Sequence, residues 1–145
     1  SKGSGSLLPL NPNKTKSTNR YFNYIYVRAG AHTFINKRTD NDIWKNLFEL
    51  PLIETSSSLP EEEFLALPEF QTLFAPGEQP VVRPVCREVK HILSHRVIYA
   101  NFYEVILPEG TASFGKFQKI KAEELERYAV SRLVHAFIEK YIGLK

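Results

Sequence analysis

The sequence predicts one α+β domain in which a mixed β-sheet is sandwiched between helices. Strand-like runs of β-branched and aromatic residues come first, a short helical segment follows, and further strands precede helical signals at residues 122–142. Strands and helices do not alternate regularly, as they do in a doubly wound parallel sheet. A chain of 145 residues is long enough to bury one hydrophobic core.

The first half of the chain carries one strong strand signal and four weaker segments. An aromatic and β-branched run predicts a strand over residues 20–29, which Gly30 ends. Ser58 stands shortly before three glutamates, which is typical of the first turn of a capped helix. After the first strand we expect a second strand at 33–37, a third apolar segment at 44–50 that Pro51 ends, a helix at 58–67 and a helical turn at 69–74.

The second half predicts a β-hairpin and C-terminal helices. Residues 81–92 and 97–107 are rich in β-branched and aromatic residues, and the second run has apolar side chains on both faces. The residues between these runs, which we expect to form the turn, are Leu93, Ser94, His95 and Arg96. A strand at 115–120 precedes a short helix at 122–128, and Ser131 is placed to cap a longer amphipathic helix.

The first nineteen residues are expected to lie outside this domain, which we place at residues 20–145. Residues 1–6 contain only Ser, Lys and Gly and look like a cloning remnant. Residues 7–19 are rich in Pro, Asn, Ser, Thr and Lys, as in a flexible interdomain linker. Because the chain contains no Met, we expect it to be a piece of a larger protein whose missing part lies upstream.

Composition narrows the classes of partner. Lys and Arg exceed Asp and Glu by 19 to 16, and the resulting net charge of +3 permits a polyanionic partner without requiring one. No apolar run approaches the roughly 20 residues that span a bilayer, so we expect no membrane contact. The single cysteine, Cys86, excludes an internal disulfide and favours a reducing compartment. We expect a monomer.

Signals for catalysis are weak. Three successive glutamates at 61–63 could in principle ligate Mg²⁺, but on one helical turn they point in different directions. His91 and His95 have the spacing of a metal pair on a helix, whereas their segment is predicted to be strand and turn. No Gly-x-Ser-x-Gly elbow or Gly-rich phosphate loop occurs. We therefore expect no catalytic residue, metal or cofactor in this chain.

Two segments, taken in order, carry a stronger signal. Residues 44–51 read Trp-Lys-Asn-Leu-Phe-Glu-Leu-Pro, and residues 93–95 read Leu-Ser-His. In this pairing the chain resembles, over roughly residues 8–144, the C-terminal domain of MutY-type adenine DNA glycosylases. The first segment is similar to the family's Gly-Leu-Trp-Glu-Phe-Pro stretch. The second is similar to the family's Phe-Ser-His loop, with Leu93 in place of Phe.

The resemblance implies a Nudix-like fold that recognises 8-oxoguanine opposite adenine in double-stranded DNA during base excision repair. The adenine would be removed by an N-terminal catalytic domain of the same chain, which in the family holds a 4Fe-4S cluster that one cysteine cannot ligate. A bacterial, cytoplasmic protein associated with the nucleoid is also implied. The residues expected at the lesion and its phosphates are Leu93, Ser94, His95, Arg96, Lys90, Arg38 and Lys37.

Two alternatives remain open, namely a Nudix-fold protein that binds or hydrolyses oxidised nucleoside phosphates, and a protein-interaction module. Nudix hydrolases follow the Trp-x-Phe-Pro region with Gly-Gly and a helix that carries Arg-Glu-x-x-Glu-Glu-x-Gly, whose carboxylates hold Mg²⁺. Here Pro51 is followed by Leu-Ile-Glu-Thr, and no such helix sequence occurs anywhere in the chain. This departure favours lesion recognition over hydrolysis.

Overall fold

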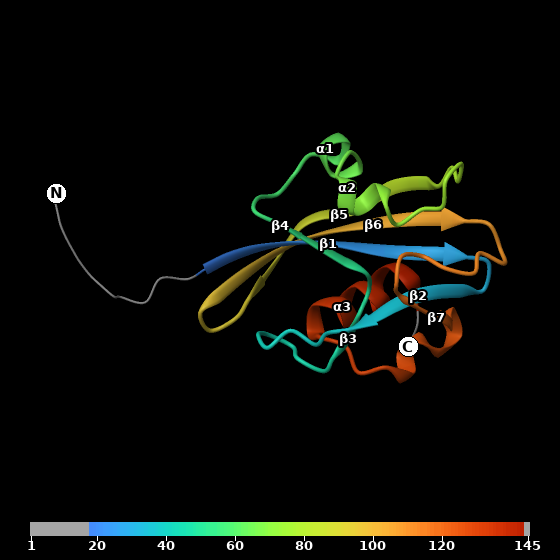
Figure 1. The fold of residues 1–145 in the computed structure, drawn as a ribbon. Helices are drawn as coiled ribbons and strands as arrows, with labels where there is room; N and C mark the ends of the chain where they lie inside the picture. Colours follow the sequence, from blue (N-terminus) through green and yellow to red (C-terminus); the bar gives the residue numbers. More distant parts are fainter. Residues whose placement is uncertain (1–17, 144–145) are drawn as a thin grey trace, which may run out of the picture.

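The computed structural model describes residues 18–143, whose strands form a mixed sheet with helices on both faces (Figure 1). The strand order is β3-β2-β1-β6-β5, and β1 (Thr18–Ala29) and β6 (Arg96–Leu107) are parallel neighbours. At one edge, β5 (Val81–Ile92) pairs antiparallel with β6. At the other, β2 (His32–Lys37) pairs with β3 (Phe48–Glu49). The predicted α+β class is confirmed.

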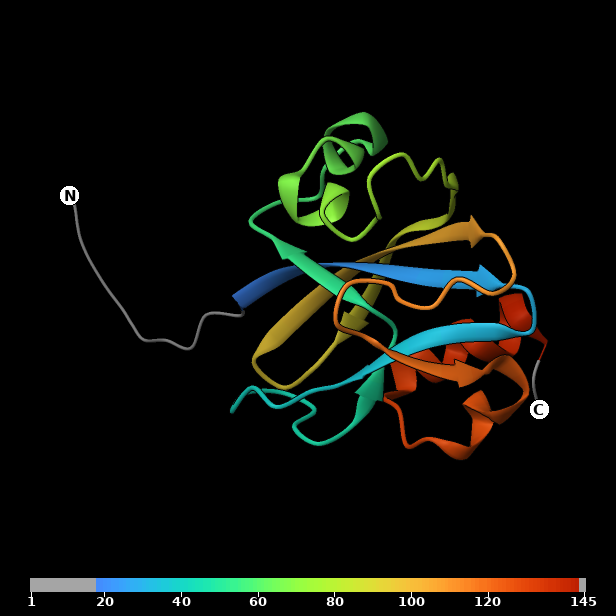
Figure 2. The same ribbon diagram turned by 45° about the vertical axis from the view of Figure 1, so that its right-hand side comes forward.

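The second edge of β1 is shared between two strands. β4 (Leu52–Thr55) pairs antiparallel with the first half of β1, from Tyr21 to Tyr24. β2 pairs with β1 only where Ala29 faces His32, and it then diverges to pair with β7 (Gln118–Lys121). The sheet therefore forks at β1, and the diverging arms are visible in Figure 2.

Side chains alternate along β1 and β6, so each strand contributes to two buried clusters. The first cluster packs against α3 (Arg132–Phe137) and includes Phe22, Tyr24, Ile98, Ala100 and Phe102. The second packs against α1 (Glu61–Leu65) and α2 (Pro68–Gln71) and includes Ile25, Val27, Ala29, Tyr103 and Val105. Both faces of the sheet are covered, which explains why β6 carries apolar residues on both of its faces.

Most expected segments are present, with some boundary corrections. β1 begins two residues before the expected domain boundary, so the last two residues of the expected linker, 18 and 19, belong to a strand. The rest of the expected remnant and linker, 1–17, lies outside the described residues. Within the apolar segment 44–50, only Phe48 and Glu49 are extended and paired. The apolar residues before them form a loop held by side-chain contacts. β4, after Pro51, is a strand that the sequence did not reveal.

The helices differ from expectation mainly at their N-terminal caps. Ser58 does not cap α1, whose N-cap is Pro60; the Ser58 hydroxyl instead donates to Glu88 Oε2 at 3.2 Å. Pro68 begins α2, since proline suits a first helical turn. By contrast, Ser131 caps α3 as expected, and its Oγ accepts a hydrogen bond from the Val134 amide at 3.2 Å.

The C-terminal helical run is longer than α3 alone. A π-helical turn, Ile138–Ile142 (η2), continues α3, and Gly143 ends it with a φ of 84°. The expected short helix at 122–128 is a 3₁₀ helix, Ala122–Arg127 (η1). Within residues 18–143, no helix has both the length and the apolar composition needed to cross a bilayer.

Candidate nucleic-acid interface at the tip of the β5–β6 hairpin

The residues between β5 and β6 form a tight, exposed turn. The strands remain paired up to Ile92 and Val97, and the Leu93 amide then donates to the Arg96 carbonyl at 2.8 Å. Ser94 and His95 are therefore the two central residues of the turn, and both side chains are exposed. The structure thus places a hydroxyl and an imidazole together at the end of a hairpin.

Backbone contacts hold this turn on a second side. The amide of Thr18, the first residue of β1, donates to the His95 carbonyl at 3.0 Å. From there β1 pairs in parallel with β6, with Thr18 facing Arg96. The turn is therefore supported by three strands, while its two central side chains take no part in that support.

A bulge in β5 is pinned by a buried amide network. Glu88 has a φ of 52°, and its amide donates to Asn101 Oδ1 at 2.8 Å. Asn101 Nδ2 donates to Asn23 Oδ1 at 3.1 Å, and Asn23 Nδ2 donates to the Ile53 carbonyl at 2.9 Å. Such bulges increase local twist and redirect a strand. The network fixes how the outer part of the hairpin leaves the sheet.

The apolar residue that reaches solvent at the tip is Ile92. Leu93, which we expected to press against bases, is only partly exposed and packs against the first cluster. Ile92 is 69% exposed. Strand alternation explains the difference, because Val89 and Leu93 lie on the face of β5 that packs inward, so Ile92 points away from it. This alternation was readable in the sequence.

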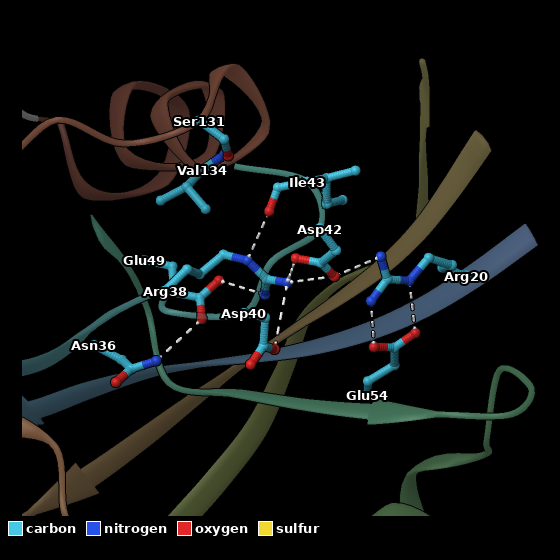
Figure 3. A network of polar contacts seen from close by, with 10 residues as sticks. All are labelled: Arg20, Asn36, Arg38, Asp40, Asp42, Ile43, Glu49, Glu54, Ser131 and Val134. Atoms are coloured by element: carbon cyan, nitrogen blue, oxygen red, sulfur yellow. Dashed lines mark hydrogen bonds and ion pairs between the residues drawn. The ribbon is translucent and has the colours of Figure 1, made fainter. Parts of the chain in front are cut away.

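Arg38 does not lie at the interface, which corrects its expected role as a phosphate contact. Its side chain is 4% exposed at the base of the loop 39–47 (Figure 3). Nη2 donates to both oxygens of Asp42 at 2.9 and 3.0 Å, Nη1 donates to Glu49 at 3.3 Å, and Nε donates to the Ile43 carbonyl at 3.1 Å. With these partners the guanidinium supports the loop.

Arg20 extends this network to the sheet. It donates to both oxygens of Glu54 at 2.7 and 2.8 Å and to Asp42 at 2.9 Å (Figure 3). Partial burial alone would raise the pKa of Asp42, but hydrogen bonds from Arg38 and Arg20 outweigh it and lower that pKa. Asp42 therefore remains ionised between two guanidinium groups.

Glu49 behaves differently from Asp42. Burial raises the pKa of its carboxyl to about 7, and the charge of Arg38 and the Asn36 hydrogen bond offset this only in part. Asn36 Nδ2 donates to Glu49 Oε2 at 3.3 Å, and Arg38 reaches the other oxygen (Figure 3). The network therefore contains one carboxyl that titrates near neutral pH.

The remaining basic residues divide by position. Lys90 and Arg96 lie on the hairpin itself. Lys90 is exposed and pairs with Tyr99, and Arg96 is partly exposed and lies at the turn. Lys37 is exposed but lies at the end of β2, which β1 separates from the hairpin strands. The structure thus gathers Ser94, His95, Lys90 and Arg96 at the tip and leaves Lys37 apart.

Trp44 and Arg132 were not predicted to lie near the tip, but both are close to its His91. The ring centroid of Trp44 lies 5.8 Å from that of His91, on the penultimate pair of the hairpin. Burial lowers the pKa of His91, and the positive charge of Arg132 lowers it further. Arg132, the first residue of α3, therefore stands near this side of the hairpin. The residues next to Arg132 in the sequence do not indicate that it lies near the hairpin.

Comparison with known proteins assigns the fold to a family. The model of the NUDIX domain matches residues 23–140, and the chain belongs to the NUDIX domain family. No curated protein matches the sequence.

Three solved structures have a similar fold. The C-terminal domain of mouse MUTYH, solved in complex with human PCNA, aligns with a TM-score of 0.65 at 16% identity and covers 86% of this chain and 88% of that chain. The Nudix hydrolase RenU from M. smegmatis gives 0.55 at 12% identity, covering 89% and 84%. The E. coli ORF135 protein gives 0.56 at 12%, covering 92% and 94%. At these low identities the structural alignments show a shared fold alone.

The residues present do not fit the divalent metal that Nudix hydrolases use. In the described part of the chain, 18–143, no three His, Cys, Asp or Glu side chains are grouped so that they could hold a metal ion. Glu62 and Glu63 are exposed on α1, a helix of five residues. The carboxylates of the loop network, in turn, are engaged by Arg20 and Arg38.

Proposed function

We propose that this domain recognises 8-oxoguanine paired with adenine in double-stranded DNA, on behalf of an adenine DNA glycosylase that removes the adenine. The observation that carries the proposal is the exposed Ser94-His95 turn on a hairpin whose backbone is fixed by β1 and β6. Polar side chains on a rigid support are what base-edge recognition requires, because a flexible reader would lose entropy on binding.

The lesion differs from guanine at an edge that these groups can contact. Oxidation at C8 turns N7 from a hydrogen-bond acceptor into a donor, so the major-groove pattern changes at that atom. The Ser94 hydroxyl can accept from the new N–H, and His95 can donate or accept through its ring nitrogens. Ile92, which is 69% exposed beside them, supplies an apolar surface that can press against a base step.

The position of Thr18 also supports this proposal. Its hydrogen bond to His95 places the start of β1 directly beside the turn. A catalytic domain joined ahead of β1 would thus be attached on the side of the sheet that carries the tip. Its 4Fe-4S cluster would belong to that domain, since this chain has one cysteine.

The test compares lesion discrimination in the proposed full-length glycosylase. Ser94→Ala combined with His95→Ala should reduce the preference for 8-oxoguanine:adenine over guanine:adenine by about 1–3 kcal/mol, the scale of a base-edge contact. The readout is kcat/KM for adenine excision from each duplex. The matched control is Ser113→Ala with His135→Ala, since both residues are exposed and lie outside the turn. Equal preference in the wild type and the tip variant would refute the proposal.

A second candidate function, nucleotide hydrolysis, is favoured by the NUDIX family match. A hydrolase of this family requires a metal site, and the described carboxylates do not supply one. The candidate predicts Mg²⁺-dependent release of phosphate or pyrophosphate from 8-oxo-dGTP by the 145-residue chain. Turnover that exceeds the buffer rate and disappears with a chelator would support hydrolysis and count against the lesion-reading proposal.

A further inference from the structure

The loop 39–47 presents a lysine beside the hairpin tip. Lys45 is exposed and takes no part in the ion pairs found among residues 18–143. Its neighbours in the loop are engaged differently, because Asp42 is bonded to two arginines and the Ile43 carbonyl accepts from Arg38. Lys45 is therefore an exposed cation outside these pairings.

The backbone around Lys45 is held in an uncommon conformation. Trp44 has a φ of 58° and Asn46 a φ of 72°, which places a left-handed residue on each side of the lysine. This region is costly for a bulky residue such as Trp and persists only where surrounding contacts enforce it. Here the Asn46 amide donates to the Arg38 carbonyl, and the Arg38 amide donates to the Leu47 carbonyl, both at 2.9 Å. The loop is closed at its base.

Two contacts fix the loop next to the tip. The Trp44 ring lies 5.8 Å from the His91 ring, and Asp42 is bonded to Arg20. His91 and Arg20 both face Ile98 across their strands, and only one further pair separates Ile98 from the turn. In both ribbon views the loop and the hairpin end project on the same side of the molecule (Figures 1 and 2).

The charge that the loop offers to solvent follows from this pairing. Arg20 is paired with Asp42 and Glu54, and Arg38 is paired with Asp42 and Glu49. Asp40 is mostly exposed, but one of its oxygens lies 3.8 Å from Arg38, which reduces its outward negative charge. Lys45 can then meet an anion, because the carboxylates of Asp42, Glu49 and Glu54 are held by the two arginines. DNA phosphates are the anions that lie next to a base pair read by the tip.

We propose that the loop 39–47 is a second DNA contact, in which the Lys45 ammonium binds a backbone phosphate while the hairpin tip reads the base pair. This inference rests on the proposed function, because the tip brings the duplex to the loop. A phosphate contact fixes the register of the protein on the duplex and carries no base information. The partly buried ion network thus serves to hold that cation at a set position relative to the turn.

The test measures binding of the 145-residue chain to 8-oxoguanine:adenine and guanine:adenine duplexes by fluorescence anisotropy over a salt series. Lys45→Ala should weaken binding to both duplexes equally, about fivefold at low salt, and lower the slope of log K against log salt by about 1. Lys45→Arg should retain the wild-type slope. The control is Lys121→Ala, since Lys121 is exposed and faces His32 at the end of the sheet away from the tip.

The outcomes separate this inference from the proposed function. An unchanged slope in Lys45→Ala would overturn the loop contact, and so would a loss confined to the lesion duplex. Equal affinity of the unsubstituted chain for both duplexes, with the expected Lys45→Ala effect, would overturn lesion reading alone. Absence of measurable DNA binding by the unsubstituted chain would overturn both. Matching thermal midpoints for all variants would verify that the substitutions leave the fold intact.

Discussion

The hairpin tip and the loop 39–47 lie side by side but are held by different interactions. The tip is held by backbone hydrogen bonds from β1, β5 and β6, which leaves Ser94 and His95 exposed. The loop is held by side chains, through Arg38 buried between Asp42 and Glu49. A polar group that satisfies its own fold is not available to a partner. Arg38 therefore lies near the hairpin tip without being available to bind a partner there.

Removing Arg38 should have the largest effect on stability. Arg38→Ala leaves Glu49 buried without its cation, so the free energy of unfolding should fall by about 3–5 kcal/mol in urea denaturation. Arg38→Met combined with Glu49→Leu removes both buried partners and should recover much of that loss. A decrease below about 1 kcal/mol for Arg38→Ala would mean that the loop is held by other contacts.

The stability of the loop 39–47 should depend on pH through Glu49. Burial raises the pKa of Glu49 to about 7 in the folded protein, compared with an ordinary value of 4.5. The folded state thus binds the Glu49 proton more tightly than the unfolded state does. The contribution of this proton to the free energy of unfolding is fully present below pH 4.5 and is lost as pH rises through about 7. Urea midpoints of wild type and Glu49→Gln should diverge over this range, with the Gln variant gaining relative stability. Parallel midpoints would contradict the assignment.

The smallest effect on stability is expected at the tip. Ser94→Ala and His95→Ala, made singly, should each change the free energy of unfolding by less than about 0.5 kcal/mol, because their side chains are exposed and the turn is held by its backbone. The same urea denaturation measures this. A drop comparable with that of Arg38→Ala would show that the two regions are not held differently after all.

The sequence was informative wherever local pattern decides structure. The hairpin strands, the turn between them and the Ser131 cap depend on alternation and on neighbouring residues, and all are present. The fold class is confirmed as well. The expected contact of Leu93 with bases stays a prediction, but the alternation that continues from β5 leaves Leu93 half-buried and turns Ile92 outward.

The loop 39–47 could not be predicted in the same way. Arg38 and Glu49 are eleven residues apart and meet only because β2 pairs with β3, a register that no local pattern encodes. Arg20 joins Asp42 and Glu54 from a third strand. The left-handed backbone at Trp44 is likewise imposed by its surroundings, since Trp disfavours this conformation. Tertiary pairing, rather than propensity, builds this region.

The fork at β1 constrains how the chain can change in length. β1 is registered with β6 over its whole span and with β4 over Tyr21–Tyr24. Deleting one residue before Tyr24 would exchange the two faces of the strand, sending Phe22 toward the wrong layer and separating Arg20 from its carboxylates. Insertions and deletions should therefore be tolerated in residues 108–113, which follow β6 and are mostly exposed, and be absent from β1.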